Sequence, residues 1–190
     1  MHHPLVLASG SPRRHQLLAM LGIPHRIDAA NIQEIRLPRE SAASYVRRLA
    51  RDKSRAVQGA WVLGADTTVV LGDEILEKPL DEADALRMLQ RLQGRRHEVM
   101  TAVCLRADGV EFEGMDTTAV YFRPAHAGFL ERYVATGEPM DKAGAYGIQG
   151  YGAALIDRIE GDFFSVMGLP VRLVLDLLGK AGWEYTFGAS

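Results

Sequence analysis

The chain has 190 residues, of which 47% are hydrophobic and 24% charged, and its formal net charge is -2. Such a chain suits one globular domain or two closely joined lobes. The charge provides no basic field for general nucleic-acid binding, and no apolar run approaches the roughly 20 residues of a membrane span. We therefore expect a cytoplasmic protein that binds neither nucleic acid nor membranes. The single cysteine, Cys104, lies in an apolar stretch and is predicted to be an inert core thiol.

Strand and helix signals alternate along the first half of the chain, which favours an α/β protein. Apolar runs predict the strands, and helical spacing of apolar residues predicts the helices. The first helix follows Ser11 and ends at Gly22. The predicted strands cover 4–8, 24–28, 61–72 and 75–79, and the predicted helices cover 12–21, 40–57 and 81–94.

The second half changes in character. Residues 97–122 read as two or three antiparallel strands joined around the turn at Asp108 and Gly109. The remaining segments are predicted as a helix at 125–135, an irregular stretch at 136–152, a hairpin at 153–168, a helix at 169–182 and a short strand at 183–187. The sequence thus predicts a mixed twisted sheet with flanking helices, as one domain over 1–190 with two lobes around a central cleft.

The segment "ASGSPRR" places two arginines at the start of the first helix. Ser11 fits the N-cap and Pro12 the first helical position, so Arg13 and Arg14 fall in the first turn. Acidic residues are favoured there because the helix dipole is positive at this end. The arginines either extend into solvent or bind an anion together with backbone N–H groups, with hydroxyls such as that of Ser9 as further donors.

Two charged residues interrupt apolar patterns. Asp66 lies inside an apolar strand, where an unpaired ionised carboxylate would cost several kcal/mol, so it needs a partner. It is either a strand-end residue bonded to loop N–H groups, or a metal ligand or general base. Lys53 continues the apolar helix face of Val46 and Leu49, either as a lysine that extends to solvent or as part of a site.

The other polar candidates lie in loops and near glycines or prolines. Glu34 belongs to the loop 29–38, Lys78 precedes a proline, and Asp141, Lys142 and Gln149 lie in the glycine-rich stretch. Together with the residues above, they supply carboxylates for a divalent cation, cations for phosphates and an amide that can read a base.

The motifs "ASGSPRR", "GADTTVV", "EKP" and "GEPMDKAGAYGIQG", in this order, resemble the Maf family of nucleoside triphosphate pyrophosphatases. The resemblance covers nearly the whole chain, from Leu5 to the last helix. It implies a mixed α/β fold related to the inosine-triphosphatase type. It also implies cytoplasmic enzymes, usually homodimers, that use a divalent metal such as Mg²⁺ or Mn²⁺ to cut a nucleoside triphosphate into a monophosphate and diphosphate.

The resemblance also implies roles for the candidates. It makes Asp66 the base on the strand, Glu34 the loop acid, and both of them metal ligands. Lys53 and Lys78 become catalytic cations. The substrate-binding residues are predicted to be Ser9, Ser11, Arg13, Arg14, Thr67, Asp141, Lys142 and Gln149.

Three positions divide the family by substrate, and here they are Arg13, Thr67 and Gln149. This combination resembles the branch that acts on dTTP and UTP. A glutamine amide can donate to a pyrimidine O4 and accept from N3–H, whereas a glutamate would suit guanine. The alternatives are a 7-methyl-GTP or broad modified-nucleotide pyrophosphatase, and a nucleotide-binding regulator of cell division without turnover.

Overall fold

The computed structural model describes residues 4–187, and contacts divide the chain into two compact units. Unit 1 comprises the described parts of Met1–Asp66, Thr101–Asp116 and Gly168–Ser190, and unit 2 comprises Thr67–Met100 and Thr117–Met167. Three long strands, β3, β5 and β6, contribute residues to both units. None of the helices within residues 4–187 is long and apolar enough to cross a membrane.

Unit 1 is built around short parallel strands. Strand β1 pairs in parallel with both β2 and β3. The elements are β1 (Leu5–Leu7), α1 (Pro12–Met20), β2 (His25–Ile27), α2 (Ala42–Ala56), α6 (Val171–Lys180) and the unit 1 parts of β3 (Trp61–Leu71), β5 (Arg96–Ala107) and β6 (Val110–Phe122). The predicted elements of the first half are therefore confirmed, with ends that differ by a few residues.

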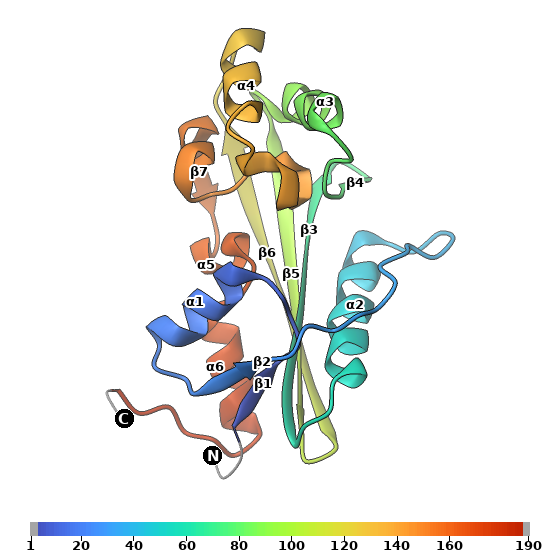
Figure 1. The fold of residues 1–190 in the computed structure, drawn as a ribbon, viewed down its shortest axis with the longest axis vertical. Helices are drawn as coiled ribbons and strands as arrows, with labels where there is room; N and C mark the ends of the chain where they lie inside the picture. The colour runs from blue at the N-terminus through green and yellow to red at the C-terminus, as the bar shows by residue number, and fades with distance from the viewer. Residues whose placement is uncertain (1–3, 188–190) are drawn as a thin grey trace. The chain divides into compact units, whose positions relative to one another are not determined.

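Helices flank the strands of unit 1 on both sides. Helix α2 lies on one side of β3, and α1 and α6 lie on the other (Figure 1). The approach of α2 is close, because a Cβ at Gly64 of β3 would lie 2.1 Å from the carbonyl oxygen of Ala50. On α6, the side chain of Leu173 packs over Gly114 of β6 in the same way. Glycine in these strands thus lets the helices seat against the sheet.

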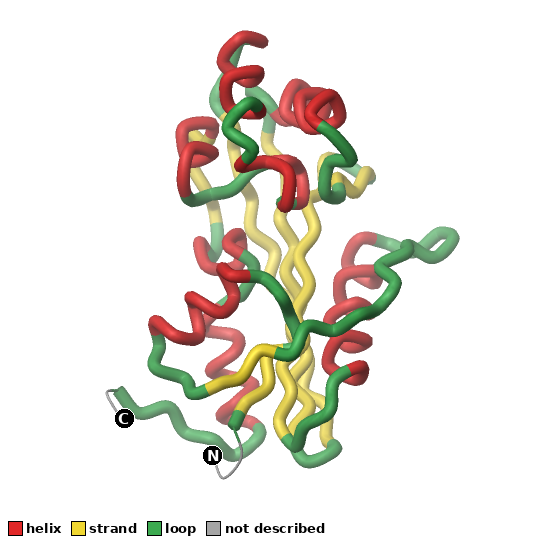
Figure 2. Tube along the Cα trace, in the orientation of Figure 1, coloured by secondary structure: helices red, strands yellow, loops and turns green. Residues whose placement is uncertain are grey.

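Unit 2 packs its helices around a second core. Residues of α3 and α4 contact each other and the short 3₁₀ turns that follow α4 (Figure 2). The elements are β4 (Glu74–Leu76), α3 (Glu82–Leu92), α4 (Ala127–Val134), η1 (Glu138–Asp141), η2 (Ala143–Ala145), η3 (Gly150–Leu155), β7 (Ile156–Glu160) and α5 (Phe163–Met167). Leu89, Leu92, Val120 and Leu130 are fully buried in this core.

The strand order is β2-β1-β3-β5-β6-β7, with β4 paired to β3. Strands β4 and β7 pair antiparallel with their neighbours, so the seven-stranded sheet is mixed. The predicted Asp108–Gly109 turn joins β5 to β6, and both residues have positive φ, 47° and 86°, as a tight hairpin requires. The predicted mixed sheet with flanking helices is confirmed.

Two predicted elements are wrong. The second half of the predicted hairpin 153–168 is helix α5, because the Asp162 carboxylate accepts hydrogen bonds from the N–H groups of Phe164 and Ser165 and so begins a helix. Residues 183–187 form no strand. Their backbone is held instead by the bond from Trp183 N–H to the Leu178 carbonyl, and Tyr185 Oη donates to the Leu21 carbonyl.

Candidate functional site

The loop between β1 and α1 holds a buried arginine. The side chain of Arg14 is 8% exposed, and its guanidinium donates to Ser9 Oγ at 2.9 Å and to the Gly168 carbonyl at 2.8 Å. The interpretation of Arg14 as a solvated residue is therefore wrong. Burial lowers the pKa of Arg14, yet a guanidinium remains charged at neutral pH. The helix start thus presents a fixed cation, with Arg13 half-buried beside it.

Ser11 occupies the predicted N-cap of α1, but its side chain makes no capping hydrogen bond. Its N–H instead donates to Ser9 Oγ at 3.2 Å, and the first turn contains no acidic residue. The helix dipole and the arginines therefore combine without a carboxylate from that turn to neutralise them. An N-terminus of this kind favours an anionic ligand.

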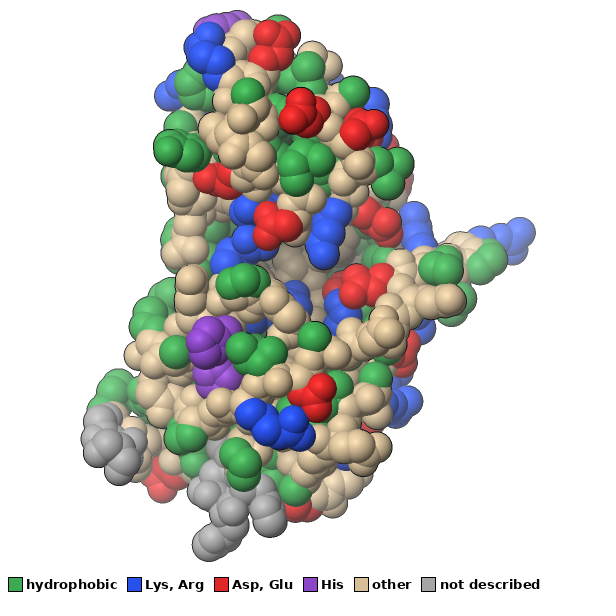
Figure 3. Space-filling model, in the orientation of Figure 1, with side chains coloured by type: hydrophobic (Ala, Val, Ile, Leu, Met, Phe, Trp, Pro, Cys, Tyr) green, Lys and Arg blue, Asp and Glu red, His purple; other side chains and the backbone are tan. Residues whose placement is uncertain are grey.

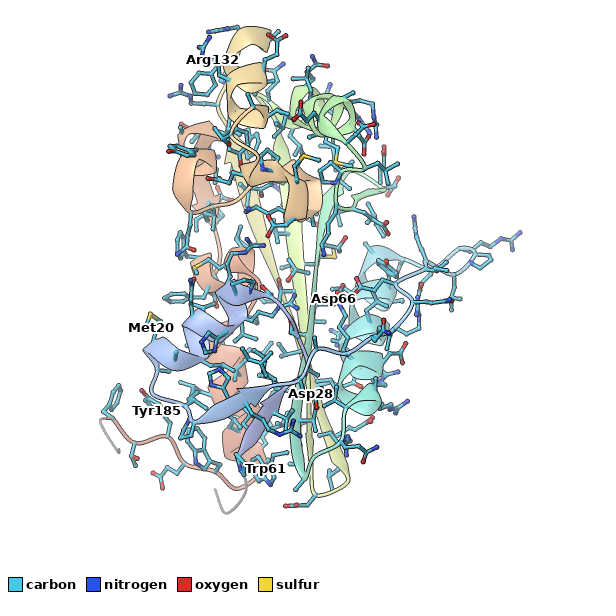
Figure 4. The ribbon with its side chains drawn as sticks, in the orientation of Figure 1. Met20, Asp28, Trp61, Asp66, Arg132 and Tyr185 are labelled. Atoms are coloured by element: carbon cyan, nitrogen blue, oxygen red, sulfur yellow. The ribbon has the colours of Figure 1, made fainter. Side chains whose placement is uncertain are left out.

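Lys53 joins two carboxylates from different parts of unit 1. Its Nζ lies 2.7 Å from Asp66 Oδ1 on β3 and 2.7 Å from Glu34 Oε1 in the loop before α2. Figure 4 labels Asp66 on β3, where it lies next to α2. The partner that a buried Asp66 requires is thus the Lys53 ammonium, rather than loop N–H groups.

The fold of unit 1 fixes this arrangement. Lys53 follows Val46 and Leu49 along the buried face of α2, and only 7% of it is exposed, so the interpretation as a solvent-seeking lysine is wrong. The loop that carries Glu34 is tied to α2, because Tyr45 Oη donates to the Glu34 carbonyl at 3.0 Å and Arg48 donates to the Ile35 carbonyl at 2.9 Å. Two of the three charged groups therefore reach the site from α2 and the loop bonded to it.

Burial raises the pKa of Asp66, while the charges of Lys53 and then Arg14 act in the opposite direction. The effect of Arg14 shows that the arginine of α1 and the carboxylate of β3 belong to one electrostatic cluster. A carboxylate with a raised pKa is a better proton acceptor than an ordinary one, because its basicity lies closer to neutral pH. The cluster thus combines a base with cations that can hold an anion.

The remaining predicted residues lie in unit 2. Lys142 Nζ donates to Asp141 Oδ1 at 2.6 Å and to the Glu138 carbonyl at 2.5 Å. Lys78 is exposed just after β4. The carbonyl of Glu77, the residue before Lys78, accepts a hydrogen bond from the Gly144 N–H at 3.0 Å. The structure therefore brings the segment of Lys78 next to the glycine-rich stretch.

Thr67 and Gln149 complete the predicted set. Thr67 is half-buried on β3, and Gln149 is exposed at the start of η3. Both residues lie in unit 2, whereas the cluster around Lys53 belongs to unit 1.

A different cluster has ligand types that could bind a metal. Cys104, Glu111 and Glu113 bring one possible ligand atom each to within 4.8 Å of one another. However, Arg55 binds Glu111 and Arg51 binds Glu113 with two hydrogen bonds each. Cys104 is fully buried, and burial raises the pKa of its thiol, as expected of an inert core cysteine.

Two histidines also meet on the surface of unit 1. His15 Nδ1 lies 2.8 Å from His25 Nε2. Figure 3 shows histidine side chains gathered in a patch in the lower half of the view. The His25 Nδ1 is in turn 2.8 Å from the Ile23 carbonyl. Within residues 4–187, no hydrogen bond or ring contact joins either histidine to the cluster around Lys53.

Sequence reasoning missed two groups that organise these residues. The Gly168 carbonyl holds Arg14, and a backbone acceptor 154 positions away leaves no signal in residue types. The Glu138 carboxylate accepts hydrogen bonds from Tyr133 Oη and from the N–H groups of Tyr151 and Gly152. The signal for Glu138 was a charged residue between a glycine and a proline in a glycine-rich stretch, which is also a common composition for surface turns.

Comparison with known proteins gives a family match. A family model described as "Maf-like protein" matches residues 4–181. A protein of Anaeromyxobacter sp. (strain Fw109-5), named "dTTP/UTP pyrophosphatase", is 50% identical, and the alignment covers 94% of this chain and 89% of that protein. A protein of Thermus thermophilus with the same name is 48% identical, with 95% of this chain and 96% of that protein covered.

A protein of Anaeromyxobacter dehalogenans (strain 2CP-1), also named "dTTP/UTP pyrophosphatase", is 50% identical over 95% of this chain and 97% of its own. Among solved structures, the Ham1 protein of Staphylococcus aureus aligns at 12% identity and a TM-score of 0.44 over 96% of this chain and 91% of that chain. The family model and the close relatives extend over both units. The chain belongs to the Maf family.

Proposed function

We propose that this protein hydrolyses dTTP and UTP between the α- and β-phosphates, releasing a nucleoside monophosphate and diphosphate. The observation that carries the proposal is the buried Lys53 ammonium, which lies 2.7 Å from both Asp66 and Glu34. It is supported by the buried Arg14 in the same electrostatic cluster. Family membership supports it independently, as do relatives of 48% to 50% identity that carry the name of this activity.

In this mechanism Asp66 is the general base. Its Oδ1 accepts from Lys53, and the carboxylate retains lone pairs to bind and orient a water molecule. Asp66 takes a proton from that water as the water oxygen bonds to the α-phosphorus. The bond from this phosphorus to the oxygen that bridges to the β-phosphorus breaks at the same time, and diphosphate leaves with that oxygen.

The proposed metal ligands are Glu34 and Asp66. Carboxylate oxygens are the ligands that Mg²⁺ and Mn²⁺ prefer, and these two already converge on a single cationic group, so the donor set fits such an ion. A bound divalent cation would neutralise phosphate charge and polarise the α-phosphorus.

Cations of this chain would stabilise the negative charge that develops on the leaving diphosphate. Arg14 and Lys53 are buried and held by hydrogen bonds, so they need little reorganisation to do this. From the resemblance we assign Lys78 to the phosphates as well, together with the hydroxyls of Ser9 and Ser11. We also assign Lys142 to the phosphates, as a cation of the glycine-rich stretch.

Base selection is assigned to Arg13, Thr67 and Gln149, with Asp141 as a further substrate contact. The exposed Gln149 amide offers both a donor and an acceptor, as the O4 and N3–H of uracil and thymine require. From the resemblance we further propose a homodimer that acts in the cytoplasm. The dimer is tested by light scattering coupled to size exclusion.

The activity is tested with a panel of triphosphates, comprising dTTP, UTP, GTP, 7-methyl-GTP and ATP with Mg²⁺, followed by detection of diphosphate. We expect UTP and dTTP to give the highest kcat/KM. Dominant turnover of 7-methyl-GTP, or similar kcat/KM for all five nucleotides, would contradict the assignment of dTTP and UTP as the substrates. Tight binding of UTP without diphosphate release would favour a regulatory protein and overturn the enzymatic proposal.

A further inference from the structure

The Glu138 carboxylate accepts hydrogen bonds from three groups of unit 2. Glu138 Oε1 accepts from Tyr133 Oη at 3.0 Å and from the Gly152 N–H at 2.9 Å, and its Oε2 accepts from the Tyr151 N–H at 2.9 Å. The side chain is only partly exposed, and the proposed mechanism gives it no role. Hydrogen bonds to a carboxylate are among the stronger ones in proteins, so this residue organises the segment around it.

These bonds replace the cap of η3. The first N–H groups of a helix lack partners within it, and the N-cap side chain usually accepts from one of them. Gln149 is the N-cap of η3, but its side chain makes no capping hydrogen bond. The N–H groups of Tyr151 and Gly152 bind Glu138 instead. The Gln149 amide is therefore not used for capping, and the residue is exposed.

Glu138 and its partner Tyr133 also make hydrogen bonds to other residues of the glycine-rich stretch 136–152. Its carbonyl accepts from Lys142 Nζ at 2.5 Å. Tyr133 Oη, which donates to the Glu138 carboxylate, accepts in turn from the Gly147 N–H at 3.3 Å. One residue thus connects Lys142, which we assign to the phosphates, with the turn that carries Gln149.

The backbone is packed tightly against this carboxylate. A Cβ at Gly150 would lie 2.5 Å from Glu138 Oε2, and the φ of Gly150 is +71°, a conformation that favours glycine. A Cβ at Gly152 would lie 2.3 Å from the Gly147 carbonyl oxygen. Glycine at position 150 therefore allows the Glu138 carboxylate to reach the backbone, and glycine at position 152 allows the close approach of the Gly147 backbone.

We propose that Glu138 is a positioning residue for base specificity: by capping η3 it sets the direction of the Gln149 amide and so selects pyrimidine over purine triphosphates. This role rests on the proposed dTTP/UTP pyrophosphatase activity. Without the cap, the amide samples more orientations, and binding of a uracil or thymine ring must then order it. The loss therefore falls on KM for UTP, while bond cleavage at saturation changes little.

The experiment compares wild type with Glu138→Ala, Glu138→Gln and Tyr133→Phe, using kcat and KM for UTP and for GTP. Glu131→Gln is the matched control, because Glu131 is exposed on α4, which also carries Tyr133. We expect Glu138→Ala to raise KM for UTP by about tenfold or more, to change kcat for UTP less than about threefold, and to lower the UTP/GTP ratio of kcat/KM about tenfold.

Glu138→Gln retains one carbonyl acceptor, so it should restore part of the UTP/GTP ratio of kcat/KM that Glu138→Ala loses. Tyr133→Phe should lower this ratio by a smaller factor than Glu138→Ala does. Glu131→Gln should match wild type. Thermal unfolding checks each variant, and if Glu138→Ala does not fold, the other two variants decide the matter. An unchanged UTP/GTP ratio in the folded variants, or an equal loss of kcat for both nucleotides, would overturn the positioning role. If wild type itself cleaves neither UTP nor dTTP, the proposed function fails instead.

Discussion

At the scale of single residues, the central feature is one ammonium group shared by two carboxylates. Lys53 is 7% exposed and Asp66 is 6% exposed, and the pair is connected by a hydrogen bond of 2.7 Å. Burial alone raises the pKa of Asp66, and Lys53 moderates that rise. The charge of the lysine thus favours the ionised form of the buried carboxylate.

This coupling predicts a pH effect. The activity of wild type should fall as the pH decreases, because Asp66 becomes protonated and can no longer accept a proton. Replacing Lys53 with Met removes the charge that lowers the Asp66 pKa. The acid limb of kcat/KM for UTP should therefore move to higher pH, and kcat should fall roughly a hundredfold.

The profile is measured between about pH 4 and pH 9, together with the melting temperature. Arg47→Met serves as the control, because Arg47 is an exposed cation on α2. If Lys53→Met lowers only the melting temperature and leaves both the acid limb and kcat unchanged, Lys53 is a structural residue and has no catalytic role.

At the scale of elements, the position of α2 depends on a glycine in β3. An alanine at Gly64 would place its Cβ 2.1 Å from the Ala50 carbonyl oxygen and 2.6 Å from the Ser54 nitrogen, both backbone atoms of α2. Because the helix that carries Lys53 would have to move, we expect Gly64→Ala to cost about 3 kcal/mol in the free energy of unfolding and to lower kcat.

Urea unfolding measures this cost. Gly179→Ala is the matched substitution, because Gly179 lies near the end of α6 and a Cβ there would approach no neighbouring segment within 4 Å. It should stabilise the protein by about 0.5 to 1 kcal/mol through helix propensity. Equal effects of the two substitutions would mean that the contact between β3 and α2 is looser than described.

The short helix α5 depends on its cap. Asp162 Oδ1 accepts from the N–H groups of Phe164 at 2.7 Å and Ser165 at 3.2 Å. Asp162→Ala should therefore cost about 1 kcal/mol, as other cap losses do. Asp157→Ala, in an exposed ion pair on β7, should cost less than about 0.5 kcal/mol in the same unfolding experiment. If Asp157→Ala costs more than Asp162→Ala, the Asp162 cap is not the reason that α5 is helical.

At the scale of the whole molecule, a buried histidine links stability to pH. His97 is 1% exposed, its Nε2 lies 2.7 Å from Tyr146 Oη, and burial lowers its pKa to about 4. In the unfolded chain the pKa is about 6.5, so between these values the unfolded state binds a proton that the folded state does not. The contribution of His97 is fully present above pH 6.5 and is lost as the pH falls.

We expect the free energy of unfolding to fall by up to about 3 kcal/mol from pH 6.5 to about pH 4 because of this residue. His97→Gln should flatten the decrease. His126→Asn, at an exposed histidine that caps α4, keeps a capping side chain and should retain the slope of wild type. If the free energy of unfolding of His97→Gln falls with decreasing pH as steeply as that of wild type, the acid sensitivity comes from groups other than His97.

Much of the fold was predictable, because the local sequence patterns indicate the same strands, turns and helices that the folded sheet contains. The Asp108–Gly109 turn and the apolar face of α2 each carry their own signal. The segment 163–167 does not, since periodicity cannot distinguish a short apolar run in a strand from one in a helix. Residues 183–187 have strand-forming side chains, but a strand also needs a neighbouring backbone, which the sequence does not reveal.

The candidate site was predictable where a charge broke an apolar pattern. Asp66 and Lys53 stood out for this reason, and the structure joins them. The contacts that hold other parts in place were not predictable, because the Gly168 carbonyl is a backbone atom and Glu138 lies in a segment of turn-like composition. Their roles depend on distances that only the folded chain defines.

The most direct measurement of the central claim is the hydrolysis of UTP with Mg²⁺ in ¹⁸O-labelled water, by wild type and by Asp66→Asn in parallel. For wild type we predict equal amounts of UMP and diphosphate, with the ¹⁸O in UMP because water attacks the α-phosphorus. Asp66→Asn should bind UTP as well as wild type does and lower kcat by roughly 10² to 10⁴. Formation of UDP and phosphate, ¹⁸O in the diphosphate, or near-normal turnover by Asp66→Asn would contradict the account.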